Sequence, residues 1–209
     1  MARPKALIVG GGSKFGEAFA KLASSDYEVH VVTGSQSEAD RVINIDWNTV
    51  NVDDILSEID KSYDLILFNQ NGGGSPNGVD NESAYYNYTQ PLEHWNRGFF
   101  NNVQLPYYIL RHCQLLRGNK ICWMLTPLMS LQLRDFGKIY GGYAADKSYN
   151  SHMVKSFSYY SDASFYGMVP KHFGDSDQFS TRMYDVIKNL DLDLSGNMID
   201  ENGDIWKCS

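Results

Sequence analysis

The sequence lacks the features that define several large classes of protein. Its three cysteines, Cys113, Cys122 and Cys208, are odd in number and have neither disulfide-framework nor metal-ligand spacing. No run of about 18 apolar residues is present, which argues against a membrane span. No signal-peptide pattern precedes the first apolar segment. We therefore expect a cytoplasmic protein with reduced thiols and no membrane partner.

Positive charge is also scarce. The net charge of −7 and the pI near 5.1 argue against a nucleic-acid partner, because binding to phosphate backbones needs clustered Lys and Arg. The five histidines form no His-x-x-x-His pair, and no Gly-x-Ser-x-Gly motif occurs, which argues against zinc and serine-hydrolase sites. Hydrophobic residues, in contrast, make up 43% of 209 residues. This content predicts one domain, 1–209, with a substantial core.

Short apolar segments alternate along the chain with segments of helical periodicity. This alternation predicts an α/β fold of the Rossmann type, a doubly wound parallel sheet with helices on both faces. We expect strands at 5–9, 27–33, 41–45, 64–68, 120–125, 163–169 and 196–200, and helices at 14–24, 52–59, 91–116, 143–160 and 178–190.

A glycine-rich turn separates the first expected strand from the first expected helix. Glycines there permit positive φ and close backbone approach, and the helix N-terminus favours phosphate. We interpret the turn as a dinucleotide-binding site, with a merely structural tight turn as the alternative. Its residues are Gly10, Gly11, Gly12, Ser13, Lys14, Phe15 and Gly16.

The end of the second expected strand bears on the choice of cofactor. Thr33 is not followed by the acidic residue that usually holds the ribose of NAD. Lys14 supplies a cation and Ser35 a hydroxyl for a 2′-phosphate, which favours NADP(H), with NAD(H) as the alternative. A solvated Lys14 at the start of a helix is the competing interpretation.

Tyr143 and Lys147 form a second candidate site. They lie four residues apart in an expected helix, so their side chains project from one face. A phenol with a pKa of about 10 is a poor base at neutral pH, but an adjacent cation favours its ionised form. The pair is therefore a candidate for proton transfer.

The order of these motifs resembles the short-chain dehydrogenase/reductase family over nearly the whole chain. The stretch from Asn69 through Asn71 to Gly72 is similar to the Asn-Asn-Ala-Gly of that family at the end of the fourth strand. Asn102 resembles the helix Asn that holds a water in the family's proton relay. Tyr143 and Lys147 match its Tyr-x-x-x-Lys motif.

Two further positions fit the resemblance. Asp46 corresponds to the Asp that contacts adenine, and Pro170 to the proline after the sixth strand. The family also has a Ser that orients the substrate. Its usual distance before the tyrosine corresponds to Ser130, whereas its usual position at the end of the fifth strand corresponds to Thr126. Spacing favours Ser130, and both stay open.

The resemblance implies an NAD(P)-dependent oxidoreductase that transfers hydride between the nicotinamide and a small carbonyl or alcohol substrate. In that scheme Tyr143 transfers the proton, while Lys147 lowers the tyrosine pKa and binds the nicotinamide ribose. The family also implies a homodimer or homotetramer, formed through the helices around Asn102 and Tyr143.

Two other functions remain open. A non-catalytic NAD(P)-binding sensor or scaffold is suggested by the altered glycine turn, in which Lys14 replaces the family's middle glycine or that glycine is displaced by one residue. The short segment between Lys147 and Pro170 also favours it. An epimerase or dehydratase is the other candidate, although such enzymes generally have a larger C-terminal substrate domain.

Overall fold

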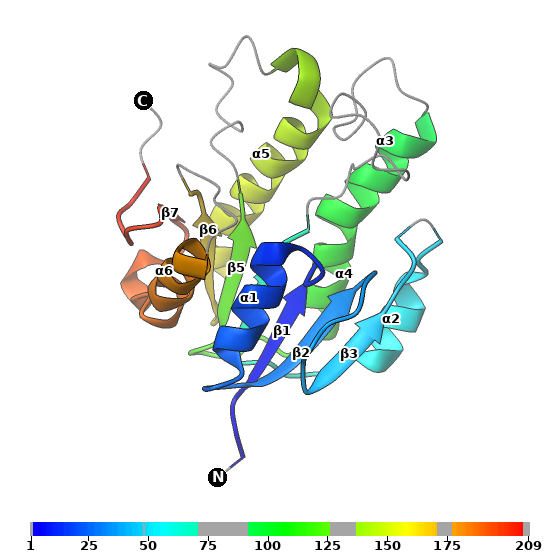
Figure 1. Ribbon diagram of the computed structural model, residues 1–209. Coiled ribbons are helices and arrows are strands. Elements are labelled where there is room, and N and C mark those ends of the chain that lie inside the picture. The colour runs from blue at the N-terminus through cyan, green and yellow to red at the C-terminus, as the bar shows by residue number, and fades with distance from the viewer. Residues whose placement is uncertain (1, 48, 71–91, 126–136, 171–176, 207–209) are drawn as a thin grey trace.

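The chain forms a parallel β-sheet with helices on both faces (Figure 1). The computed structural model describes residues 2–47, 49–70, 92–125, 137–170 and 177–206, and of residues 94 and 137–143 only the backbone. Within these ranges the sheet has seven strands: β1 (Lys5–Val9), β2 (Glu28–Thr33), β3 (Arg41–Asn44), β4 (Leu65–Phe68), β5 (Lys120–Met124), β6 (Ser164–Met168) and β7 (Met198–Ile199). The helices are α1 (Lys14–Ala23), α2 (Val52–Glu58), α3 (Leu92–Phe99), the π-helix η1 (Phe100–Gln104), α4 (Leu105–His112), α5 (Gly137–Tyr160), α6 (Asp177–Lys188) and the 3-10 turn η3 (Leu192–Leu194).

The strands are continuous runs of apolar residues because both faces of the sheet are covered. In β1, Leu7 and Val9 belong to the core on the face of α2, α4 and α5, whereas Ala6 and Ile8 belong to the core on the face of α1 and α6. Successive strand residues point to opposite faces, so one strand serves both cores. The predicted doubly wound α/β fold is confirmed.

The strand order fixes where a ligand can bind. The order is β3-β2-β1-β4-β5-β6-β7, so the chain first builds outward from β1 to β3 and then crosses over to β4 on the other side of β1. In sheets of this type, ligands bind at the carboxyl ends of the strands where the order reverses. The candidate site is therefore expected above the ends of β1 and β4.

Two helix boundaries differ from the sequence prediction by more than two residues. The helix expected at 91–116 ends at His112, where Cys113 becomes extended and the Gln114 amide donates to the Lys61 carbonyl at 2.6 Å. The helix expected at 143–160 begins already at Gly137. It contains two further glycines, each costing about 1 kcal/mol in helix propensity, so local propensity was a poor guide there.

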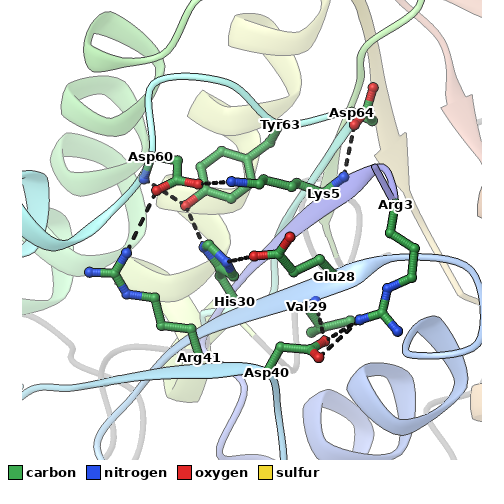
Figure 2. A network of polar contacts seen from close by, with 10 residues as sticks. All are labelled: Arg3, Lys5, Glu28, Val29, His30, Asp40, Arg41, Asp60, Tyr63 and Asp64. Atoms are coloured by element: carbon green, nitrogen blue, oxygen red, sulfur yellow. Dashed lines mark hydrogen bonds and ion pairs between the residues drawn. The ribbon is translucent and has the colours of Figure 1, made fainter. Parts of the chain in front are cut away.

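A polar network closes the opposite, amino-terminal end of the sheet (Figure 2). His30 is buried in β2, with Nδ1 lying 3.1 Å from the Tyr63 hydroxyl and Nε2 lying 3.1 Å from the Glu28 carboxylate. The Tyr63 hydroxyl also accepts from the Asp60 amide at 2.9 Å. Lys5 donates to the Asp60 carboxylate, a hydrogen bond that holds the pKa of that carboxyl below its ordinary value. The network ties the first residues of the strands to the α2–β4 connection.

Removing the Tyr63 hydroxyl is expected to destabilise the fold. Tyr63→Phe leaves the Asp60 amide and His30 without this partner, and lost partners of buried polar groups cost about 1–3 kcal/mol. Urea denaturation measures the loss. The matched control is Tyr159→Phe, since that side chain is 83% exposed and a surface change of this kind alters stability by less than about 0.5 kcal/mol. Equal losses in the two variants would contradict the role of the network.

None of the helices in the described ranges combines the length and the hydropathy needed to cross a membrane.

Candidate active site

The glycine turn lies at the carboxyl end of β1, at the point where the strand order reverses. Gly10 has a φ of 87°, and its amide donates to the Val32 carbonyl at 2.9 Å. A Cβ on Gly10 would lie 2.9 Å from the backbone of Asn69 and of Gln70. Only glycine meets both constraints, because the positive φ and the close backbone approach each disfavour a side chain.

Asn69 fixes the turn from the end of β4. Its amide Nδ2 donates to the Gly10 carbonyl at 3.0 Å and to the Ser13 hydroxyl at 2.9 Å. Ser13 is also the N-cap of α1, and its hydroxyl accepts from the Gly16 amide at 3.0 Å. The N-terminus of α1 is thereby held at the carboxyl edge of the sheet, where its dipole favours a phosphate group.

Close packing around the turn explains the other glycines. A Cβ on Gly16 would lie 2.8 Å from the Gly11 backbone, and one on Gly12 would collide with the hydroxyls of Thr33 and Ser35. Gly12 therefore packs directly against the end of β2. Such a bare backbone beside a helix N-terminus fits the pyrophosphate of a dinucleotide.

Replacing Gly10 with alanine is expected to lower both stability and cofactor affinity. The change forces a Cβ into positive φ and against backbone, a combination that costs roughly 2 kcal/mol or more. The matched control is Gly118→Ala, since Gly118 has a φ of 97° but nothing within 4 Å of an added Cβ. Urea denaturation and NADPH titration measure both variants. Equal losses of stability and of NADPH affinity in the two variants would contradict a role for the close approach of Gly10 to Asn69.

Three residues that the sequence predicts to contact the cofactor follow or flank this turn: Lys14, Ser35 and Asp46. The Ser35 amide donates to the Thr33 hydroxyl at 3.1 Å, and the Ser35 hydroxyl lies 3.2 Å from the same oxygen. Lys14 lines an open groove of about 620 Å³ together with Gln36, Glu38 and other residues of α1 and α6. Asp46 is exposed and accepts from the Thr49 hydroxyl at 3.2 Å.

Lys147 lies at the same carboxyl edge of the sheet, at the ends of β4 and β5. Its side chain is 2% exposed, and Nζ donates to the carbonyls of Gln70 and Met124, each at 2.8 Å. These carbonyls follow β4 and end β5, so one ammonium bridges two strand ends. Tyr143 lies one helical turn earlier in α5, and its side chain is outside the described part of the structure.

Asn102 lies in the π-helical segment η1, which packs against α5. A proline at position 106 has no amide hydrogen, so the Asn102 carbonyl cannot accept the α-helical hydrogen bond from four residues later. That carbonyl instead accepts from Asn150 Nδ2 at 3.0 Å. Irregular π-helical turns are frequent at functional sites.

A buried carboxyl completes this cluster. Asp146 is 4% exposed and accepts from Asn102 Nδ2 at 3.0 Å. Burial raises the pKa of the Asp146 carboxyl to about 7, and the neighbouring Lys147 opposes the rise. Burial lowers the pKa of the Lys147 ammonium to about 7, which Asp146 opposes. Pairs of groups perturbed in this way are common at functional sites.

The sequence-predicted residues thus separate into two groups and a remainder. The glycine turn, Thr33, Ser35 and Asn69 lie together. Lys147 and Asn102 are connected through Gln70, whose carbonyl accepts from Lys147 and whose side-chain amide donates to the carbonyl of Asn101, the neighbour of Asn102. Phe15 packs against Phe19 and Phe179, and Pro170 is buried after β6. Four predicted residues lie outside the described residues: Asn71, Gly72, Thr126 and Ser130.

The sequence interpretation missed several polar residues of the cluster. Gln70 donates from Nε2 to the Asn101 carbonyl at 3.1 Å, which joins the end of β4 to η1. Asp146 and Asn150 were missed as well. A proline four residues after Asn102 was the available signal, because it frees a carbonyl that then needs another donor. In the described residues, no group of three His, Cys, Asp or Glu side chains is placed to hold a metal ion.

Comparison with known proteins was informative at the level of structure. The sequence matches no family model and no curated protein. Among solved structures, the carbonyl reductase Sniffer of D. melanogaster has a TM-score of 0.73 at 15% identity, over 97% of this chain and 98% of that one. The chain has the fold of the short-chain dehydrogenases/reductases.

Two further structures agree with this short-chain dehydrogenase/reductase fold. A carbonyl reductase from Pseudomonas aeruginosa PAO1 has a TM-score of 0.71 at 16% identity, over 99% of each chain. A short-chain dehydrogenase/reductase from Serratia marcescens has a TM-score of 0.69 at 16% identity, over 96% of this chain and 98% of that one. The likeness spans nearly the full length of each of these proteins.

Proposed function

We propose that this protein is an NAD(P)-dependent oxidoreductase of the short-chain dehydrogenase/reductase family that interconverts a small carbonyl compound and its alcohol. The observation that carries the proposal is the position of Lys147. Its buried ammonium lies at the carboxyl edge of the sheet, one helical turn after Tyr143. The likeness to carbonyl reductases supports the same reaction class.

The residues of the chain have distinct roles in this reaction. Bound nicotinamide supplies or accepts the hydride. The N-terminus of α1 and the glycine turn bind the pyrophosphate of the cofactor. Tyr143 donates a proton to the substrate oxygen during reduction and accepts it during oxidation, while Ser130 or Thr126 donates a hydrogen bond to that oxygen. The Lys147 ammonium favours the ionised form of Tyr143 by its charge.

The cofactor proposed is NADP(H). Lys14 lies at the start of α1, and Ser35, an exposed residue, places its hydroxyl beside Gly12 of the same turn. A 2′-phosphate there gains a cation and the helix dipole. The groove beside Lys14 also contains Glu17, Glu38 and Asp177, which would repel a phosphate. The comparison of the two cofactors is therefore a necessary part of the test.

The proposal is tested by titrating the protein with NADPH and with NADH, followed by a panel of small aldehydes and ketones with cofactor oxidation as the signal. We expect NADPH to bind more tightly than NADH and at least one carbonyl compound to be reduced. Failure to bind either cofactor would contradict the proposal. Tight binding without any turnover would favour the sensor or scaffold instead.

The proposed assembly is a homodimer or homotetramer through α4 and α5. An open groove of about 600 Å³ between these helices is lined by aromatic side chains, and several of them are exposed: Phe99, Tyr107, Tyr108 and Tyr149. Exposed apolar patches of this kind mark interaction surfaces. Sedimentation velocity is expected to give a dimer or tetramer, and a monomer at micromolar concentration would contradict the assembly.

A further inference from the structure

Two successive main-chain carbonyls of η1 each accept a hydrogen bond from a side-chain amide of another element. Gln70 Nε2, at the end of β4, donates to the Asn101 carbonyl at 3.1 Å. Asn150 Nδ2, in α5, donates to the Asn102 carbonyl at 3.0 Å. Both donors are buried, since Gln70 is 5% exposed and Asn150 is 1% exposed. The π-helical turn is therefore bonded to two other elements of the candidate site.

These contacts form a closed ring that includes Lys147. The Lys147 ammonium donates to the Gln70 carbonyl at 2.8 Å, and the Gln70 side chain donates to η1. Asn150, which donates to the next carbonyl of η1, lies three residues after Lys147 in α5. Residues three apart in a helix lie on the same face. The ring therefore connects the ammonium, the end of β4 and η1 to one face of α5.

Asn150 supplies a donor at a position where the helix itself cannot. Pro106 has no amide hydrogen, so the Asn102 carbonyl cannot accept the α-helical hydrogen bond from four residues later. The side-chain amide of Asn150 donates to this carbonyl instead. The loss of a hydrogen bond inside a protein is costly, and the backbone rearranges to reduce that cost. We therefore expect the conformation of η1 at Asn102 to depend on Asn150.

We infer that Asn150 is a positioning residue of the site, which fixes the backbone of Asn102 against the face of α5 that carries Lys147. Its importance for turnover rests on the proposed function, because displacing Asn102 or Lys147 lowers the rate only if they serve the reaction. A displacement of about 1 Å in a catalytic site can cost roughly 100-fold in rate. The hydrogen bond itself does not depend on which reaction the protein catalyses.

A double-mutant cycle with Pro106 tests the hydrogen bond. In Asn150→Ala, the Asn102 carbonyl loses its side-chain donor. In the Pro106→Ala background, position 106 has an amide that can donate to this carbonyl in helical geometry, so the loss of Asn150 should matter less. We expect Asn150→Ala to lower the urea midpoint of the wild type, and to lower that of Pro106→Ala by about half as much or less. Equal shifts in the two backgrounds would overturn the inference.

The same cycle in kcat distinguishes positioning from a purely structural role. At saturating NADPH, we expect Asn150→Ala to lower kcat roughly tenfold or more in the wild type and about threefold or less in Pro106→Ala. The control Lys155→Ala removes an exposed side chain from the same helix and is expected to keep the wild-type urea midpoint and kcat. An Asn150→Ala variant with a lower urea midpoint but the kcat of wild type would show that Asn150 only stabilises the fold.

Two measurements decide the outcome if Asn150→Ala does not fold. The double variant Pro106→Ala/Asn150→Ala should fold and retain about a third or more of the kcat of Pro106→Ala. In the wild type, the side-chain amide protons of Asn150 should exchange with water at least about 100-fold more slowly than those of the exposed Asn44, because a buried amide exchanges only when the structure opens. A double variant that is unfolded or inactive beside an active Pro106→Ala, or equal exchange at Asn150 and Asn44, would contradict the role of Asn150.

Failure of the proposed function would give a different result. If the wild type binds neither cofactor and reduces no carbonyl compound, the proposed oxidoreductase activity fails. The urea cycle and the amide exchange still decide, in that case, whether Asn150 fixes η1 against α5.

Discussion

Replacing Tyr143 with phenylalanine is expected to abolish most carbonyl reduction while leaving NADPH binding intact. The change removes one hydroxyl from the helix that also carries Lys147. If that hydroxyl transfers the proton, kcat falls by roughly 10²- to 10⁴-fold, which is the usual contribution of general acid–base catalysis. Steady-state kinetics on the best substrate of the carbonyl panel measure the loss.

The control for Tyr143→Phe is Tyr159→Phe, a change on an exposed tyrosine of the same helix. It is expected to alter kcat by less than about twofold, since exposed substitutions away from a site have small effects. An NADPH dissociation constant that matches wild type would assign the loss in Tyr143→Phe to the chemical step. A Tyr143→Phe variant with near wild-type kcat would exclude Tyr143 as the proton donor.

Replacing Lys147 with methionine is expected to have the second largest effect. The change removes the buried ammonium that bridges the carbonyls of Gln70 and Met124 at the ends of two strands. We expect kcat to fall by roughly 10²-fold or more, because Tyr143 loses the cation that favours its ionised form. Weaker NADPH binding should accompany the loss, if Lys147 also binds the nicotinamide ribose.

The pH dependence of the Lys147→Met variant separates a chemical role from a structural one. Without the ammonium, the phenol pKa rises, so alcohol oxidation should need a higher pH than in wild type. Lys155→Gln, on the exposed face of the same helix, should retain the wild-type profile. A Lys147→Met variant with lower activity but an unshifted profile would indicate that Lys147 only supports the fold.

The fold was predictable because its signals are local and repeated. The run Lys5–Val9 is apolar at nearly every position, ends at glycines and precedes a helical period, and the same alternation recurs along the chain. A parallel sheet buried on both faces follows from such a pattern. The glycine turn was predictable for a similar reason, since its position between strand and helix is a sequence property.

The interior of the candidate site was not predictable in the same way. The partner of Asp146 is Asn102, which is 44 positions away in the sequence, and no local pattern specifies that contact. The π-helical turn depends on how η1 packs against α5 as well as on Pro106. Buried polar groups are placed by tertiary contacts. Sequence periodicity does not report such contacts, and it therefore assigns no role to Asp146.

Hydride transfer is tested most directly by incubating the protein with 4-deuterated NADPH and the best carbonyl substrate, and then analysing the alcohol by mass spectrometry. The proposed reaction requires that deuterium from the reactive face of the cofactor appear on the carbinol carbon, and that the labelled alcohol form at least about 100-fold more slowly with Tyr143→Phe than with wild type. An alcohol without deuterium from either face of the labelled cofactor would contradict the proposed reaction, and equal rates of labelled alcohol formation with both proteins would contradict the role of Tyr143 in it.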